Sequence, residues 1–205
     1  MENNLTSAEK GKKFLYELRD MIVGAAFPLM LMLVFSVSII LFAFVDDFGI
    51  KIAVLIVGEL LLAGAYIIFG KFNGTTAAKK QVQNDTKRKL NSTEPKVVFR
   101  TGEYAPYKGF LIGLVSCVPY IIVQIIESAC PNVFTGFLVR YAFGWAFLPF
   151  DMAGLSTWLN LIWVIPLSCI HGVAYIVGGR AEIQRQQKVV EMQSASKSAG
   201  KHKDK

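Results

Sequence analysis

The segment formed by residues 50–69, IKIAVLIVGELLLAGAYIIF, most constrains the fold of this chain. It is 20 residues long, and a helix of that length crosses a hydrocarbon core of about 30 Å. Its Ile, Leu, Val and Phe residues favour insertion by roughly 4 to 7 kcal/mol, whereas one acid at its centre, Glu59, opposes insertion by about 3 kcal/mol. Insertion therefore wins, and we expect the segment to span a membrane with Glu59 facing protein.

Three further apolar segments, residues 21–44, 109–126 and 157–177, are also long enough to span. The link between the first two spans, residues 45–49, is so short that these spans must form an antiparallel hairpin. With 53% hydrophobic residues, the composition excludes an ordinary soluble domain. The sequence predicts an all-α membrane protein with four transmembrane helices in two antiparallel hairpins.

Residues 128–156 are harder to assign. Within them, residues 134–150 form a hydrophobic stretch at the short limit for a span, with Arg140 inside it and Pro149 near its end. We predict an outer re-entrant or interfacial helix here, and a fifth span is the alternative.

The distribution of positive charge decides between these two arrangements. Of the 22 Lys and Arg residues, four precede the first span, nine lie in residues 71–108 and seven follow the last span. Only Lys51 and Arg140 fall elsewhere. Positive residues stay on the cytoplasmic side, so four spans with both termini in the cytoplasm are predicted, and a fifth span would move the basic tail outside.

The polar segments divide the chain further. Residues 1–20 predict an amphipathic helix lying along the cytoplasmic interface, and residues 21–70 and 109–178 hold the two hairpins. Residues 71–108 predict a basic cytoplasmic loop with a polar helix over residues 75–90. Residues 179–205 predict a basic cytoplasmic tail, helical to about residue 193 and disordered from Ser194.

Polar residues inside the spans form the first candidate site. Counting from the outer ends, Glu59 falls at the midplane of its helix and His171 about 5 Å further in, which is close enough for the two side chains to touch. The other residues on the same two helical faces are Tyr66 beside Glu59, and Asn160, Ser168 and Tyr175 beside His171. One interpretation is a protonatable relay or a substrate-coordinating site. The other is a structural hydrogen bond between two helices.

A second candidate site lies near the predicted outer surface. Gln124 and Glu127 end the third span, and Arg140 and Asp151 lie in the outer segment that folds back over it. A Glu127–Arg140 ion pair would explain an arginine in an apolar segment and would anchor the outer helix. A ligand-binding vestibule is the alternative.

The third candidate is a basic surface formed by Lys79, Lys80, Lys87, Arg88 and Lys89. Such a cluster binds anionic lipid headgroups at about 1 kcal/mol per residue, or simply sets the topology. No aromatic residues are interleaved to stack on bases, so nucleic-acid binding is not predicted.

The sequence contains no Walker loop, HExxH, GxSxG or dinucleotide-binding fingerprint, and its three cysteines have no CxxC spacing. No enzyme activity, cofactor or metal is therefore predicted. Gly58, Gly64 and Gly70 recur every six positions rather than four, which predicts no close-packing face.

We predict a non-enzymatic accessory or scaffold subunit of a bacterial cytoplasmic membrane, within a larger complex or a homo-oligomer. The alternative is a component of a small-molecule, ion or proton-coupled transporter that uses Glu59 and His171. A membrane enzyme is a distant third hypothesis.

Overall fold

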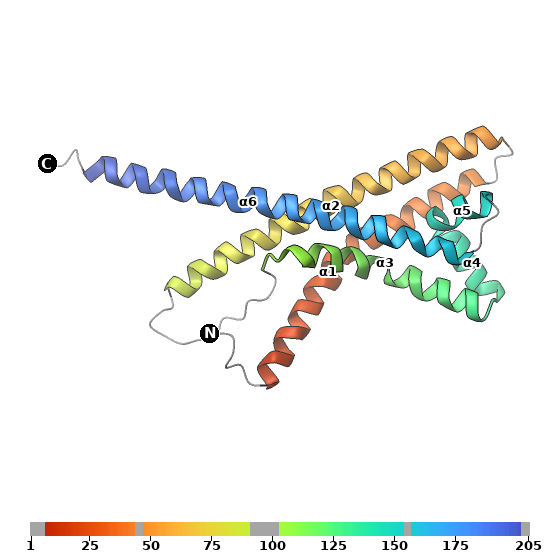
Figure 1. The fold of residues 1–205 in the computed structure, drawn as a ribbon, viewed down its shortest axis with the longest axis horizontal. Coiled ribbons are helices and arrows are strands. Elements are labelled where there is room, and N and C mark those ends of the chain that lie inside the picture. The colour runs from red at the N-terminus through yellow and green to blue at the C-terminus, as the bar shows by residue number, and fades with distance from the viewer. Residues whose placement is uncertain (1–6, 44–46, 91–102, 154–156, 202–205) are drawn as a thin grey trace.

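The computed structural model describes residues 7–43, 47–90, 103–153 and 157–201, and these residues are almost entirely helical (Figure 1). Six α-helices and one 3-10 helix follow one another along this described chain. They are α1 (Ser7–Ala43), α2 (Phe48–Leu90), α3 (Pro106–Ala129), α4 (Val133–Ala142), α5 (Gly144–Met152), η2 (Thr157–Trp163) and α6 (Val164–Lys201). The predicted all-α class is confirmed.

Four stretches of the described helices are long and apolar enough to cross a membrane. They are Lys10–Val37, Phe48–Thr86, Pro106–Ala129 and Leu159–Val189. Large apolar side chains on them point outward, for example Leu60, Ile68 and Ile165, which are 68%, 66% and 65% exposed. Such a surface is unfavourable in water and suits a lipid environment. The chain therefore has the helices of an integral membrane protein.

Two helices extend without a break beyond the ends that hydropathy predicted. In α1 the amphipathic N-terminal segment and the first span form one helix, which runs through the predicted boundary at Asp20 and Met21 without a break. In α2 the polar residues 75–90 continue the span rather than forming a helix of their own. This part of α2 contains no proline and is rich in Ala, Lys and Gln, which are strong helix formers.

The last span also differs from the prediction at both ends. It begins as the 3-10 helix η2 and becomes α-helical only at Val164. Its backbone stays helical to Lys201, whereas composition predicted disorder from Ser194. Elongation adds one hydrogen bond per residue to a helix that the bundle has already nucleated, which explains the difference.

The outer hydrophobic segment forms two short helices instead of one. Helix α4 begins with a capping box, in which the Asn132 side chain accepts from the Thr135 amide and the Thr135 hydroxyl accepts from the Asn132 amide. The chain turns at Phe143, and α5 then places Trp145 inside the bundle, where it is fully buried. Helix α5 contacts α1, α2 and η2.

Contacts between helices give their relative directions. Gly24 and Phe27 of α1 lie opposite Asn73 and Phe69 of α2, so these helices are antiparallel. Helices α2 and α6 run parallel and make the most extensive contacts in the bundle, and α3 is antiparallel to α6. The start of α1 and the ends of α2 and α6 thus share one end of the bundle, which we call the basic end (Figure 1).

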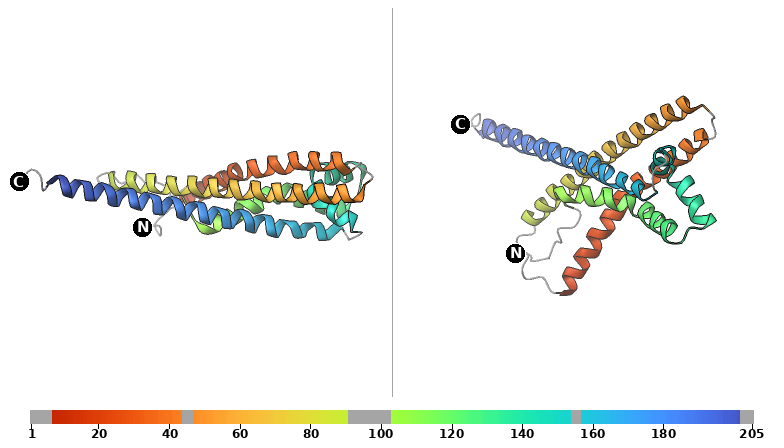
Figure 2. Two further views of the ribbon diagram at one scale, coloured as in Figure 1. Left: turned by 90° about the horizontal axis from the view of Figure 1, so that it is seen from above. Right: turned by 45° about the vertical axis from the view of Figure 1, so that its right-hand side comes forward.

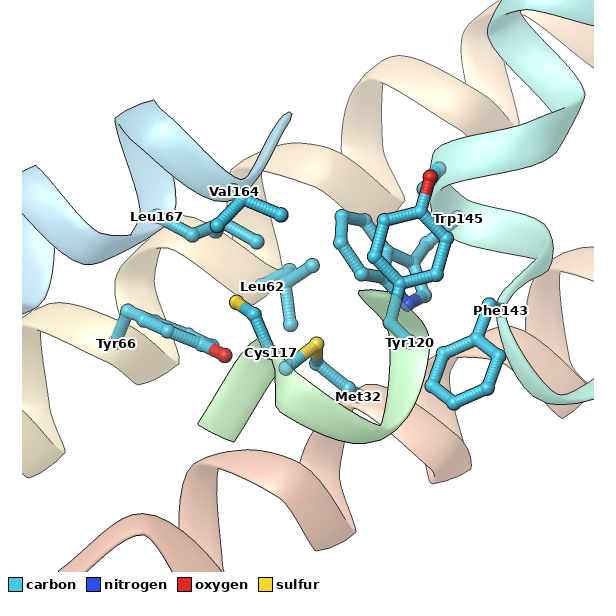
Figure 3. Packing of buried hydrophobic residues seen from close by; sticks show 10 residues of the cluster. Met32, Leu62, Tyr66, Cys117, Tyr120, Phe143, Trp145, Val164 and Leu167 are labelled. Carbon is cyan, nitrogen blue, oxygen red and sulfur yellow. The ribbon is translucent and has the colours of Figure 1, made fainter. Parts of the chain in front are cut away.

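The main apolar core lies toward the opposite end of the bundle. Figure 3 shows its buried side chains from close by. There the ring of Tyr120 in α3 packs 5.3 Å from that of Phe143 and 5.4 Å from that of Trp145. The rest of the core comprises Met32, Leu62, Tyr66, Cys117, Ala146, Val164 and Leu167. Side chains of α1, α2, α3, α5 and α6 thus meet in one cluster.

Candidate functional site: a polar junction beside a cavity

Small residues bring α2, α3 and α6 close together near the basic end. A Cβ atom on Gly70 of α2 would lie 2.6 Å from the carbonyl oxygen of His171, and one on Gly74 would overlap the Tyr175 carbonyl. On α3, a Cβ on Gly113 would lie 2.9 Å from the Cα of Ser168. These distances leave no room for side chains, so glycine is what allows the backbones to approach.

His171 lies at this crossing and is fully buried. Its Nδ1 lies 2.8 Å from the carbonyl oxygen of Gly109 in the first turn of α3. A carbonyl only accepts, so Nδ1 carries the proton and donates it. In the neutral ring, Nε2 is then left as an acceptor.

Asn73 of α2 faces that acceptor. Its Nδ2 lies 3.4 Å from His171 Nε2 and donates a second hydrogen bond of 3.1 Å to the carbonyl oxygen of Gly24 in α1. The chain Gly109–His171–Asn73–Gly24 therefore connects α3, α6, α2 and α1. We call these four residues the polar junction, because a single hydrogen-bonded path ties together all four long helices.

The predicted contact between Glu59 and His171 is not formed. His171 is level with Gly70, which lies eleven positions after Glu59 on α2. At 1.5 Å per residue this separates the two depths by about 16 Å. Within the described part of the chain, Glu59 Oε1 is buried and has no hydrogen-bond partner. A relay by direct contact between the two side chains therefore has no geometric basis.

The other residues of that predicted site are divided between several contacts. The Tyr66 hydroxyl shares a 2.8 Å hydrogen bond with Ser116 of α3, and its ring packs edge-on against His171. Tyr175 stacks on Tyr104 with ring centroids 5.5 Å apart. The Ser168 hydroxyl and the Asn160 amide are buried and find no hydrogen-bond partner among the described residues.

Glu59 shares the inner face of α2 with Leu55, Leu62 and Tyr66, so it borders the apolar core. Because an unsatisfied buried polar group costs about 1 to 3 kcal/mol, we expect Glu59→Leu to raise the free energy of unfolding by about 1 kcal/mol. The matched control is Glu127→Leu, because that carboxylate accepts from the Thr135 hydroxyl and its loss should destabilise. Unfolding in detergent, followed by circular dichroism, measures both. A loss of stability in Glu59→Leu would instead assign Glu59 a stabilising partner.

At the predicted outer site, Glu127 is bonded to Thr135, near the start of α4, and thereby holds the capping box against the end of α3. Gln124 is fully buried on the same helix. The side chains of Arg140 and Asp151 lie outside the described residues, so the Glu127–Arg140 pair stays a prediction.

The described part of the predicted basic surface lies on α2. Lys79 and Lys80 are exposed, and Lys80 Nζ lies 3.8 Å from Asp20 Oδ2 of α1. The side chains of Lys87, Arg88 and Lys89 lie outside the described residues. Lipid binding by this surface also stays a prediction.

A cavity of about 220 Å³ adjoins the polar junction on the side of the basic end. Residues of α1, α2 and α3 line it, together with Glu103 and Tyr175, and Asn73 and Gly24 form part of its wall. Its charged groups are paired across helices: Lys108 Nζ lies 3.5 Å from Glu17 Oε1 and donates to the Glu103 carbonyl. The Lys108 side chain is only 10% exposed.

No protein-family model, curated protein or solved structure matches this chain. Chemically, the junction can hold helices together, and its Asn73 side chain forms part of the cavity wall. Among the described residues, no group of three or more His, Cys, Asp or Glu side chains is placed to hold a metal ion.

Sequence reasoning missed Asn73, Gly24 and Lys108. One signal was present: Gly70 and Gly74 are four positions apart, as are Gly109 and Gly113. The predicted span ends at residue 69, so Gly74 lies outside it. A helix that continues past Gly70 places Gly70 and Gly74 on one face, at the four-residue spacing of close-packed helices.

Proposed function

We propose that this chain is a non-enzymatic scaffold subunit of a cytoplasmic membrane, with the basic end and both termini in the cytoplasm. The arrangement of polar groups supports this reading, since the junction residues connect backbones and side chains of different helices. The positive-inside bias supports the orientation, because 20 of the 22 Lys and Arg residues lie in the three sequence segments that the charge count assigns to the cytoplasm, 1–20, 71–108 and 179–205.

The observation that carries the proposal is the length of α6. Its last buried side chain among the described ones is Glu182, 5% exposed, to which Gln186 donates a 2.8 Å hydrogen bond. From Gln187 onward the described side chains are exposed, including Met192 at 64%. We call residues 188–201 the α6 arm, and Figures 1 and 2 show it reaching beyond the other helices.

The described side chains of the arm gain no packing from the bundle, because they are exposed, and helices in soluble surroundings are stabilised mainly by packing. A rigid helix continuous with a membrane span is, however, well suited to position a partner at a fixed distance from the bilayer. We therefore assign the α6 arm to contact with another subunit of a membrane complex.

The test removes residues 188–205 from the full chain and compares it with a control that lacks only residues 202–205. We expect the shorter chain to keep its helical bundle, because the described side chains among the removed residues, those of Lys188, Val189 and Met192, are exposed. Its assembly, extracted from native membranes and run on a native gel, should fall to the size of the free protein, whereas the control keeps the larger size. An unchanged size for the shorter chain would contradict the scaffold function.

A further inference from the structure

The cavity at the basic end has an apolar margin that opens toward lipid. Val23 and Phe27 of α1 and Phe72 of α2 line it and are 64%, 65% and 64% exposed. All three belong to helices that are apolar enough to span a membrane. The cavity is therefore open to the bilayer as well as to the polar rim at the basic end.

The charged groups of the cavity lie where lipid headgroups would be. Asp20 directly precedes the uncharged residues 21–44, and Lys108 directly precedes the apolar residues 109–126. Asp20 pairs with Lys80 at 3.8 Å, and Lys108 pairs with Glu17 at 3.5 Å. A molecule with its hydrocarbon part along Phe27 would place its polar part among these four side chains.

The size and charge of the cavity indicate which polar part fits. Its volume of about 220 Å³ is below the roughly 300 to 1,000 Å³ of sites that enclose a whole small molecule, so it holds a headgroup while the chains stay outside. Its ionisable side chains are the carboxylates Glu17, Asp20 and Glu103 and the amines Lys80 and Lys108. Arg19 Nη2 also lies 3.5 Å from Asp20 Oδ1, so three cations match the three carboxylates, and this balance favours a zwitterionic headgroup over an anionic one.

We infer that the cavity binds the headgroup of a phosphoethanolamine lipid from the leaflet at the basic end. The primary ammonium of such a lipid donates hydrogen bonds to Asp20 and Glu17, while its phosphate reaches Lys80. The Lys80 side chain is 48% exposed and its pair with Asp20 is long, so its ammonium group can donate hydrogen bonds to the phosphate. A phosphocholine headgroup has the same charges but no N–H donors, and phosphatidylglycerol lacks the cation.

The experiment measures binding of three lipids with identical acyl chains to the purified full-length protein by native mass spectrometry. The lipids are dioleoyl phosphatidylethanolamine, phosphatidylcholine and phosphatidylglycerol. We expect the wild-type protein to retain phosphatidylethanolamine about tenfold more tightly than either of the others, as one or two charge-assisted hydrogen bonds imply.

Two variants locate the site, each with a matched control. Thr76→Phe fills the cavity and should abolish the preference, whereas Thr86→Phe, at an exposed position farther along α2, should retain it. Asp20→Asn removes the ammonium acceptor and should lower the preference several-fold, whereas Asp47→Asn, an exposed carboxylate at the opposite end, should not.

Equal binding of the three lipids by the wild-type protein would overturn the inference, and so would a preference for phosphatidylglycerol. A preference that persists in both Thr76→Phe and Asp20→Asn would place the lipid elsewhere and overturn it as well. If Thr76→Phe does not fold, Asp20→Asn decides, since its side chain is at the rim and 24% exposed. The scaffold proposal fails separately, through an unchanged native-gel size.

Discussion

Gly74→Ala is expected to destabilise the bundle by about 2 to 3 kcal/mol, although alanine is the better helix former. A Cβ atom at this position would overlap the backbone carbonyl of Tyr175 and lie 3.0 Å from the backbone nitrogen of Gly179. Backbone atoms of a packed helix cannot turn aside as a flexible side chain does, so α2 and α6 must separate. Overpacking of this kind typically costs about 1 to 3 kcal/mol, with lost contacts along the crossing added.

Gly64→Ala is the matched control on the same helix. A Cβ atom on Gly64 would have no neighbour within 4 Å, so only helix propensity changes. That term favours alanine by up to about 1 kcal/mol, and the control should therefore be neutral or slightly stabilised. Detergent unfolding of the two variants, followed by circular dichroism, gives the comparison. Equal effects of both substitutions would mean that α2 and α6 do not pack as closely as described.

Local composition was enough to predict the four apolar helices. A run of some twenty apolar residues has few alternatives to a membrane-spanning helix, since its backbone must satisfy its own hydrogen bonds in lipid. The position of residues 134–150 outside the set of long helices was also predictable, because Arg140, Gly144 and Pro149 shorten any helix there. These features depend on one segment at a time.

Contacts between helices could not be predicted in the same way. The Glu59–His171 contact was expected from depths counted inward from the apolar ends, which assumes that each helix starts and stops with its apolar stretch. In the structure α2 continues to Leu90 and the last span begins as a 3-10 helix, with a different rise per residue. The register is determined instead by where glycines let backbones meet, and this places His171 beside Gly70.

His171→Ala is expected to lower the free energy of unfolding by about 2 to 4 kcal/mol. The imidazole is fully buried, so its removal leaves a cavity in addition to breaking the hydrogen bond to the Gly109 carbonyl. Val173→Ala, two positions along α6 and 56% exposed, is the control and should change stability by less than about 1 kcal/mol. A similar loss of unfolding free energy in both variants would show that His171 stabilises the bundle no more than the exposed Val173 does.

The polar junction makes a stronger claim, which is that His171 and Asn73 act together. A double-mutant cycle with Asn73→Ala separates their direct interaction from the effect of each truncation. The Nδ2–Nε2 distance of 3.4 Å is long, so we expect a coupling energy of about 0.6 kcal/mol, typical of hydrogen bonds between membrane helices. Asn73→Ala alone also removes the hydrogen bond to the Gly24 carbonyl of α1, which loosens the α1–α2 contact and should speed cross-linking between these two helices. His171→Ala should not change the cross-linking rate, because the Asn73–Gly24 hydrogen bond survives. Strictly additive effects of the two substitutions would mean that His171 and Asn73 do not interact. The Gly109–His171 and Asn73–Gly24 hydrogen bonds would then be two separate helix contacts rather than parts of one junction.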